Sequence, residues 1–294
     1  MFKRLLNTFS YPVLTPSTSQ MPLVKAACLI IGDEVLNGKI TDTNSRFFAQ
    51  YCYRLGINLR EIATIGDQKD QISSSIKRLS AENDLVITSG GIGPTHDDIT
   101  YESIASAFNL HCELNKQCQD RMRKISKPEQ RYDSNALKDF YRMATLPAGP
   151  EVHSFYVLDE LWVPIVAISQ KVYILPGIPQ LFEKLLNAFE PTLKQLYNVN
   201  DRDPHLYERY FIKTKKSESE ISAFLRELQS RCVAVSGEIK IGSYPHYGMG
   251  FNTVSILGLK EHTIFLKELV KESIQKLDGK PITAEEEQRI SDSR

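Results

Sequence analysis

Strand-like segments alternate with segments that are apolar on one side only through the first part of the chain. Residues 26–31, 58–65 and 85–88 predict strands. Between them, residues 45–55 and 70–81 repeat apolar side chains at helical spacing and predict helices. This strand–helix–strand–helix–strand order predicts a parallel sheet covered by helices on both faces, a three-layer α/β/α architecture.

The pattern then becomes mixed. Helical spacing predicts helices at 115–126, 134–143 and 180–188. Two apolar runs, 163–168 and 171–175, predict a hairpin that adds antiparallel strands to the sheet. The sheet is therefore expected to be mostly parallel.

A small second unit is predicted after a polar linker at 199–204. Its predicted elements, in order, are a strand at 207–214, a helix at 218–229, strands at 232–236 and 238–243 (or one bent strand across both), a strand at 251–257, and a helix at 261–277. This order is a split βαβ pattern, which is typical of an α+β subdomain. The chain therefore divides into an N-terminal extension (1–24), a main domain (25–198), an α+β subdomain (205–280) and a polar tail expected to be loose (281–294).

The segment 84–100 concentrates residues suited to phosphate chemistry. It carries three glycines and then two aspartates: Gly90, Gly91, Gly93, Asp97 and Asp98. A strand, a glycine turn and the helix predicted from 99 to 108 would present backbone N–H groups at the positive end of a helix dipole, which is an anion site. The two carboxylates would repel a bare phosphate, so a cation is expected between them.

A simpler interpretation of this segment needs no ligand. Thr95 and Asp98 have the spacing of a capping box, and glycine-rich turns join strands to helices in many α/β proteins that bind no phosphate. The glycines match neither the dinucleotide-binding fingerprint nor a P-loop. The local pattern leaves both interpretations open.

A second acidic loop favours the functional interpretation. Asp33 and Glu34 follow the first predicted strand, and the carboxyl ends of parallel strands meet at the edge of the sheet where ligands bind. The two acidic loops should therefore face one crevice. Gly177, in a rigid turn between two prolines, is expected beside it.

Two further segments are weaker candidates. Lys124, Lys127, Arg131, Lys138 and Arg142 form a basic stretch, for which a solvated helix face is favoured over contact with a ligand phosphate. Tyr244 lies in a turn with glycines, a second ring and a lysine. That turn has the groups to hold a flat ring or a phosphate, and an ordinary turn between strands is the alternative.

Composition narrows the class of protein. The 36 basic and 36 acidic residues give no net charge, so no nucleic-acid partner is expected. No apolar run approaches the length of a membrane span, so no membrane partner is expected either. Five cysteines without paired spacing indicate reduced, mostly packed thiols.

The first 24 residues contain Lys3, Arg4 and many hydroxyl side chains but no acid. This composition is typical of a mitochondrial transit peptide. The alternative is a simple extension, with the domain beginning near Met21 and the protein in the cytoplasm.

Three motifs carry a resemblance to a known family: IIGDEVLNGKITDTN, SGGIGPTHDD and VYILPGIPQLFEKL. They resemble the molybdopterin-binding-type domain that CinA-like and MoaB-like proteins share with the amino-terminal half of eukaryotic FAD synthase. The match runs from about Ala26 to Phe189, and GSYP at 242–245 is similar to the eukaryotic FAD-synthase branch. The chain looks most similar to stand-alone FAD pyrophosphatases of fungal type.

The resemblance implies a divalent metal, Co²⁺ or Mg²⁺, with K⁺ as a further candidate, and a homo-oligomer. It implies Asp97 and Asp98 as metal ligands and assigns catalysis to them and to Asp33. The substrate-binding residues it implies, together with those expected from the loops, are Gly90, Gly91, Gly93, Thr95, His96, Glu34, Asn44, Gly177 and Tyr244. His96 stands where bacterial relatives usually carry lysine, which puts a phosphate contact by that side chain in question.

The resulting hypothesis is metal-dependent hydrolysis of FAD, or of ADP-ribose, to AMP and a second monophosphate. The sequence has no room for the amidohydrolase domain of CinA or the adenylyltransferase domain of FAD synthase, so synthesis of FAD is not expected. The rival is a non-catalytic protein that binds a flavin or molybdopterin nucleotide.

Overall fold

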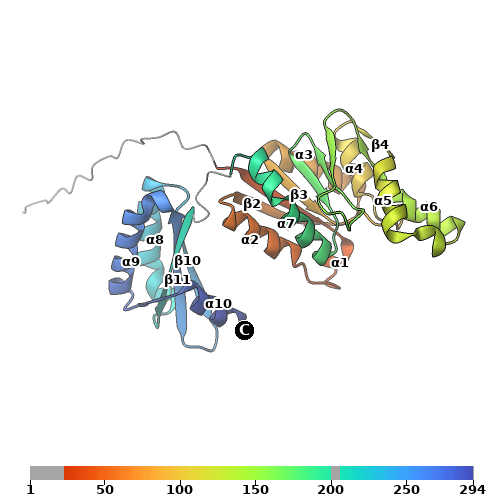
Figure 1. Ribbon diagram of the computed structural model, residues 1–294. Coiled ribbons are helices and arrows are strands. Elements are labelled where there is room, and N and C mark those ends of the chain that lie inside the picture. Colours follow the sequence, from red (N-terminus) through yellow and green to blue (C-terminus); the bar gives the residue numbers. More distant parts are fainter. Residues whose placement is uncertain (1–22, 200–205, 294) are drawn as a thin grey trace, which may run out of the picture.

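The computed structural model describes residues 23–199 and 206–293 and contains a mixed six-stranded sheet (Figure 1). Its strands, in spatial order, are β2 (Asn58–Ile65), β1 (Lys25–Ile31), β3 (Leu85–Ser89), β8 (Val172–Leu175), β7 (Ile165–Ile168) and β6 (Val152–Phe155). The pairs β1–β2, β1–β3 and β3–β8 are parallel, and β7 and β6 are antiparallel to their neighbours. The mostly parallel sheet and the hairpin are confirmed.

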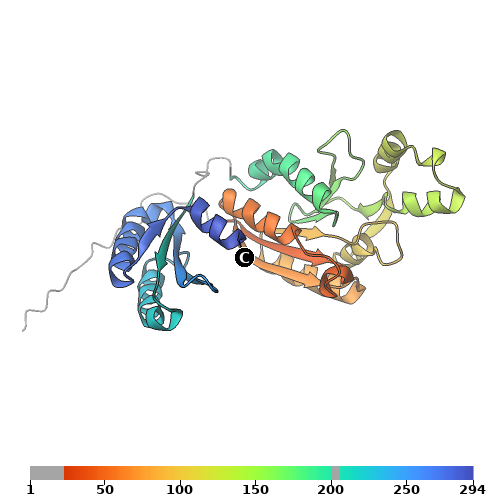
Figure 2. The same ribbon diagram turned by 90° about the horizontal axis from the view of Figure 1, so that it is seen from below.

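Helices cover both faces of this sheet, as Figures 1 and 2 show. The helices are α2 (Asn44–Arg54) and α7 (Pro179–Leu196), which contact each other, and α3 (Lys69–Glu82) and α4 (Thr100–Ala107), which form a second contacting pair. Their apolar faces bury Phe48, Ile76, Ile104 and Phe182 completely. This packing confirms the three-layer α/β/α architecture.

A small lobe extends from one side of the main sheet (Figure 1). It contains a two-stranded sheet of β4 (His111–Leu114) and β5 (Thr145–Ala148), with α5 (Lys116–Ser126), the short helix η1 (Pro128–Gln130) and α6 (Ser134–Arg142) between them. The two helices were predicted, and the two strands were not. With four residues each, these strands are too short to show a clear alternation of apolar and polar side chains.

The C-terminal unit has its own sheet and core. The sheet order is β10 (Lys240–His246), β11 (Phe251–Leu259), β9 (Tyr207–Thr214) and β12 (Lys280–Ile282), and every pair is antiparallel. Helices α8 (Glu218–Val235) and α9 (Thr263–Lys276), with η2 (Lys260–His262) before α9, complete the predicted split βαβ order. Its core includes Ile212, Leu228, Val254 and Leu269.

Several predicted boundaries were wrong. The strand expected at 232–236 is instead the end of α8, because Cys232 continues the buried stripe of Leu228 while Val233 and Val235 are exposed. Residues 33–36, expected as loop, form the one-turn helix α1 (Asp33–Leu36), and α7 runs eight residues past its predicted end. The tail is not loose: it adds β12 to β9 and then forms α10 (Ala284–Asp292), whose first turn is capped by the Thr283 hydroxyl.

Two predictions concern residues that the structure does not describe. The transit peptide falls almost entirely within residues 1–22, and most of the linker falls within 200–205. Among the described residues, all five cysteines are free thiols and four are buried, as expected. No helix in the described ranges combines the length and apolar character needed to cross a membrane.

Candidate functional site

Four loops meet at the carboxyl ends of the parallel strands β1, β2, β3 and β8. The Asp33 amide, after β1, donates a 2.9 Å hydrogen bond to Asp67 Oδ2, after β2. A methyl group built on Gly177, after β8, would lie 3.1 Å from the Cα of Gly90, after β3. The two acidic loops and the turn at Gly177 therefore share one crevice at this edge of the sheet.

The glycines of the turn after β3 are required by its backbone. Gly90 has a φ of +111°, and a methyl group there would overlap the carbonyl oxygen of Ile31. Gly91 has a φ of +65°, and its methyl group would overlap Thr100 Oγ1 and lie 3.3 Å from Asp67 Oδ1. The turn thus packs closely against β1 and the start of α4, with the Asp67 carboxylate beside it.

The residues between this turn and α4 depart from the sequence prediction. Helix α4 begins only at Thr100, with Ile99 as its N-cap, so Asp97 and Asp98 are not in its first turn. They belong to a separate turn in which Asp98 Oδ2 accepts from the Thr95 amide at 2.9 Å and from its hydroxyl at 2.5 Å. Only half of the capping box expected of Thr95 and Asp98 is present, because the Asp98 amide donates to the carbonyl oxygen of Thr95 rather than to its hydroxyl, and these bonds close a loop rather than cap a helix.

Asp97 is the exposed carboxylate of this turn. Its side chain is 58% exposed, and the fully open His96 ring lies 3.9 Å from one of its oxygens. Hydrogen bonding from the Thr95 hydroxyl and from its own amide, with the charges of His96 and Arg142 nearby, lowers the pKa of Asp97. Asp97 is therefore an ionised group available to a ligand or cation in the crevice.

Asn44 joins two of the loops at the start of α2. Its Nδ2 donates to Ser89 Oγ and to the carbonyl oxygen of Gly177, both at 2.8 Å. The residue is only 4% exposed, and its Oδ1 has no hydrogen-bond partner among the described residues. A buried acceptor without a partner is costly, which indicates a site for a donor from a bound molecule.

Sequence reasoning missed Asp67. Burial raises its pKa above 3.8, and so do the charges of Glu34, Asp33 and Asp97, while the hydrogen bond from the Asp33 amide works against them. Asp67 therefore has Asp33, Glu34 and Asp97 close enough to repel its charge. The signal available was its position at the carboxyl end of the predicted second strand, the same rule that selected Asp33.

The geometry can be compared with known proteins at this point. Residues 27–195, more than half of the chain, match the family described as a probable molybdopterin binding domain. The chain belongs to this family. A probable FAD synthase of Caenorhabditis elegans is 33% identical over 247 residues, which cover 78% of this chain and 45% of that protein. The chain thus spans about half the length of that relative.

Two CinA proteins extend the comparison. A CinA-like protein of Thermotoga maritima is 32% identical over 178 residues, covering 60% of this chain and 43% of that protein. The crystal structure of CinA from Thermoplasma acidophilum, described as of unknown function, aligns with a TM-score of 0.50 at 28% identity, covering 58% of this chain and 98% of that chain. The molybdopterin-binding-type domain is thus the main domain, and the crevice lies within it.

Tyr244 is not part of the crevice of the molybdopterin-binding-type domain. It lies on β10, an edge strand of the C-terminal sheet (Figure 1). No hydrogen bond, ion pair or ring contact within 23–199 and 206–293 joins it to the crevice loops. Its hydroxyl instead lies 3.3 Å from the position of a methyl group on Gly242.

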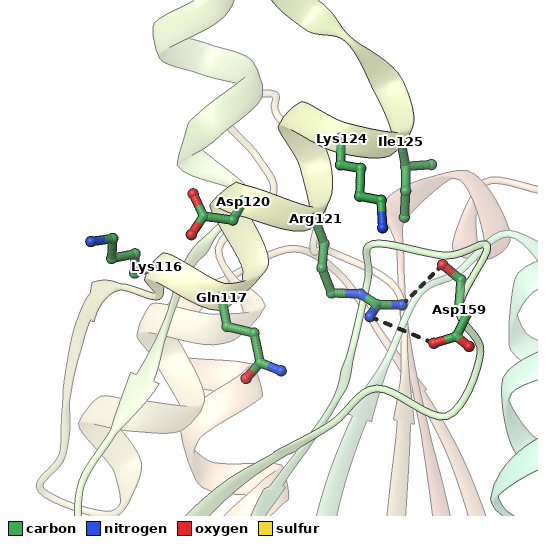
Figure 3. Close-up of a pocket in the computed structure, with 7 residues that line it drawn as sticks. All are labelled: Lys116, Gln117, Asp120, Arg121, Lys124, Ile125 and Asp159. Carbon is green, nitrogen blue, oxygen red and sulfur yellow. Dashed lines mark hydrogen bonds and ion pairs between the residues drawn. The ribbon is translucent and has the colours of Figure 1, made fainter.

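A cavity beside α5 also lies away from the crevice. It has a volume of about 690 Å³ and is lined by Lys116, Gln117, Asp120, Arg121, Lys124, Ile125 and Asp159 (Figure 3). Arg121 donates to the carbonyl oxygens of Leu158, Asp159 and Leu161, so it ties α5 to that loop. The cavity is a groove beside this structural contact.

The carboxylates around the crevice of the molybdopterin-binding-type domain are the type of ligand that a hard divalent cation prefers. Asp33, Glu34, Asp67 and Asp97 offer oxygen donors, and a cation would relieve the repulsion that raises the pKa of Asp67. Within the described part of the chain, no three His, Cys, Asp or Glu side chains are already gathered as a metal site. The donor types are those that a hard cation takes, and the ligand roles of Asp97 and Asp98 stay predictions; one oxygen of Asp98 already closes the turn.

The charge cluster gives a pH-dependent prediction for Asp67→Asn. Because the folded-state pKa of Asp67 is raised above 3.8, the folded protein holds the extra proton more tightly, and stability falls as the pH rises through that window. The Asn variant lacks this loss, so it should gain stability relative to the parent between pH 4 and pH 7. Urea unfolding of both proteins in EDTA measures the difference, and parallel pH profiles would contradict it.

Proposed function

We propose that the chain hydrolyses the pyrophosphate of a dinucleotide. FAD would give FMN and AMP, and ADP-ribose would give ribose 5-phosphate and AMP. One observation carries the proposal: a partly buried glycine turn lies within contact distance of Asp67, at the edge of the sheet where Asp33, Glu34 and Asp97 also lie. The flavin nucleotide is favoured because a similar protein is named a probable FAD synthase.

The glycine turn would receive the pyrophosphate. A larger residue at Gly91 or Gly93 would overlap Thr100 Oγ1 or the Asp98 carboxylate, so the glycines keep the turn in the shape in which its backbone N–H groups would bind phosphate oxygens. Asn44 Oδ1, the buried acceptor without a partner, would take a hydrogen bond from a hydroxyl or ring N–H of the nucleotide. These contacts would orient the anhydride against the carboxylates.

Asp97 would hold the divalent cation, with Asp33 and Glu34 as further oxygen donors and Asp98 contributing through its remaining oxygen. When bound, the cation supplies charge neutralisation at the phosphate oxygens and a lower pKa for water. Without it, the carboxylates would repel the substrate.

The protein's own role in the reaction is to position the water and to take its proton. The water oxygen forms a bond to one phosphorus as the bond from that phosphorus to the bridging oxygen breaks. Asp67 would accept the proton, because burial, the main cause of its raised pKa, makes it a better base than an ordinary aspartate. The bridging oxygen leaves on the second phosphate, so two monophosphates result.

The rival is a protein that binds a flavin or molybdopterin nucleotide without cleaving it. The family description, a probable molybdopterin binding domain, supports this alternative. The nucleotide would bind in the same crevice. The carboxylates would then hold a cation that neutralises the bound phosphates, and would not activate water.

Incubation of the full chain with FAD, ADP-ribose or NAD, each with Mg²⁺, Co²⁺ or EDTA, separates the two functions. We expect AMP from FAD or ADP-ribose with a divalent cation and none in EDTA, measured by chromatography of the nucleotides. Tight binding of FAD with no AMP under any condition would support the rival and reject hydrolysis.

A further inference from the structure

Arg142 lies in the small lobe and contacts the turn from Thr95 to Asp98 (the site turn). It is the last residue of α6 and lies 40 to 47 positions from the residues it contacts. Its Nη1 donates to the carbonyl oxygen of Thr95, and its Nη2 donates to the carbonyl oxygen of Asp98 at 2.9 Å. Nη2 also lies 3.2 Å from Glu102 Oε1 on α4.

The two carbonyl groups that Arg142 binds stand on either side of His96 and Asp97. A guanidinium is a rigid planar fork, so the two bonds fix the distance between the ends of the turn. The pair with Glu102 holds the guanidinium itself against α4. Arg142 therefore links the lobe, the site turn and the helix after it.

Asp97 depends on this link because its other contacts, with Thr95 and His96, lie within the turn itself. Its side chain is mostly exposed, so its backbone sets where the carboxylate lies. The hydrogen bonds within the turn run between Thr95 and Asp98. One of them, 3.2 Å long, goes from the Asp98 amide to the carbonyl oxygen of Thr95, so Arg142 is a second donor to that oxygen. A site group displaced by about 1 Å can lose up to a hundredfold in rate.

We propose that Arg142 is a positioning residue that holds the Thr95–Asp98 turn, and with it Asp97, in the geometry the site requires. The proposal rests on the proposed function for its kinetic consequence. It replaces the sequence interpretation of Arg142 as a solvated residue of a basic helix face. Its guanidinium acts on the backbone and need not touch the substrate.

The chain offers a matched control in Arg121. That arginine also donates to loop carbonyl oxygens from a helix of the same lobe, but it does so beside the cavity in Figure 3 and away from the crevice. Arg142→Ala and Arg121→Ala therefore remove the same kind of contact at two places. A merely structural role predicts similar effects for both.

Kinetics give the first readout. We expect Arg142→Ala to lower kcat by about tenfold or more with KM changed less than twofold, because the turn that carries Asp97 loosens. Arg142→Lys, which keeps the charge but not the fork, should fall between, and added guanidinium should restore part of the activity of Arg142→Ala. Arg121→Ala should keep the parent kcat, whatever its effect on thermal unfolding.

Amide hydrogen exchange gives a readout that needs no activity. Peptides that cover residues 92–99 should exchange faster in Arg142→Ala than in the parent, and at the parent rate in Arg121→Ala. If the parent cleaves no dinucleotide, the proposed function fails while this measurement still decides the role of Arg142. Unchanged exchange in Arg142→Ala, or an active parent whose Arg142→Ala variant keeps its kcat, overturns the proposal. If Arg142→Ala does not fold, kcat and amide exchange are measured for Arg142→Lys and Glu102→Gln instead.

Discussion

Replacing Asp97 with Asn should lower the rate of dinucleotide hydrolysis by roughly a hundredfold or more, because contacts that neutralise charge in a phosphoryl transition state contribute several kcal/mol. The free energy of unfolding should change little, since the side chain is mostly exposed and the turn is closed by its neighbours. Turnover of FAD at saturating divalent cation and urea unfolding in EDTA measure the two quantities.

Asp98→Asn is the matched comparison for this prediction. Asp98 Oδ2 accepts both hydrogen bonds that close the turn, so the Asn variant should lose about 1 kcal/mol of stability. If Asp98 is also a metal ligand, the hydrolysis rate of Asp98→Asn should fall as far as that of Asp97→Asn. If it only closes the turn, most of the turnover is kept. Hydrolysis at the parent rate by Asp97→Asn would remove this turn from the catalytic site.

The sequence predicted the main sheet well because its parallel strands are buried on both faces. Strand β3 has all five residues buried and β1 six of seven, and such continuous apolar runs identify themselves without tertiary information. The crevice followed from the rule that ligands lie at the carboxyl ends of parallel strands. Asp33, Asn44, Gly90 and Gly177 do lie together there.

The parts that the sequence did not predict depend on contacts between distant segments. Asp67 is a single acid in a loop, and it matters only because folding brings it to the glycine turn. Arg142 matters only because α6 ends beside a turn 44 residues earlier in the chain. The helix α10 is polar on its own, and β12 before it is held by pairing with β9. Local periodicity contains none of this information.

The site turn shows how one local pattern can support two interpretations. The Asp98 carboxylate accepts from the Thr95 amide, which is one of the two bonds of a capping box, yet the helix begins beyond them at Thr100. The first amide of α4 donates instead to the carbonyl oxygen of Gly91, and the Thr100 hydroxyl donates to that of Gly90. The helix start is thus fastened to the glycine turn, and Asp97 stands in the loop between them.

Gly90→Ala should be among the most destabilising single substitutions in the main domain. At a φ of +111° an alanine is strained, and its methyl group would overlap the carbonyl oxygen of Ile31, a backbone atom of the central strand β1 that cannot rotate away. Backbone strain and overpacking each cost about 1–3 kcal/mol, so the free energy of unfolding should fall by about 3 kcal/mol or more. Urea unfolding measures this loss.

Gly38→Ala is the control that separates strain from overlap. Gly38 also has a positive φ, +75°, but no atom lies within 4 Å of the place where its methyl group would stand. Its alanine variant should therefore lose only about 1 kcal/mol, the cost of a left-handed backbone for a residue with a side chain. Equal losses at the two positions would mean that the close approach of Gly90 to β1 does not constrain the site turn. A much larger loss at Gly90 would show that the glycine turn beside Asp67 is built on that contact.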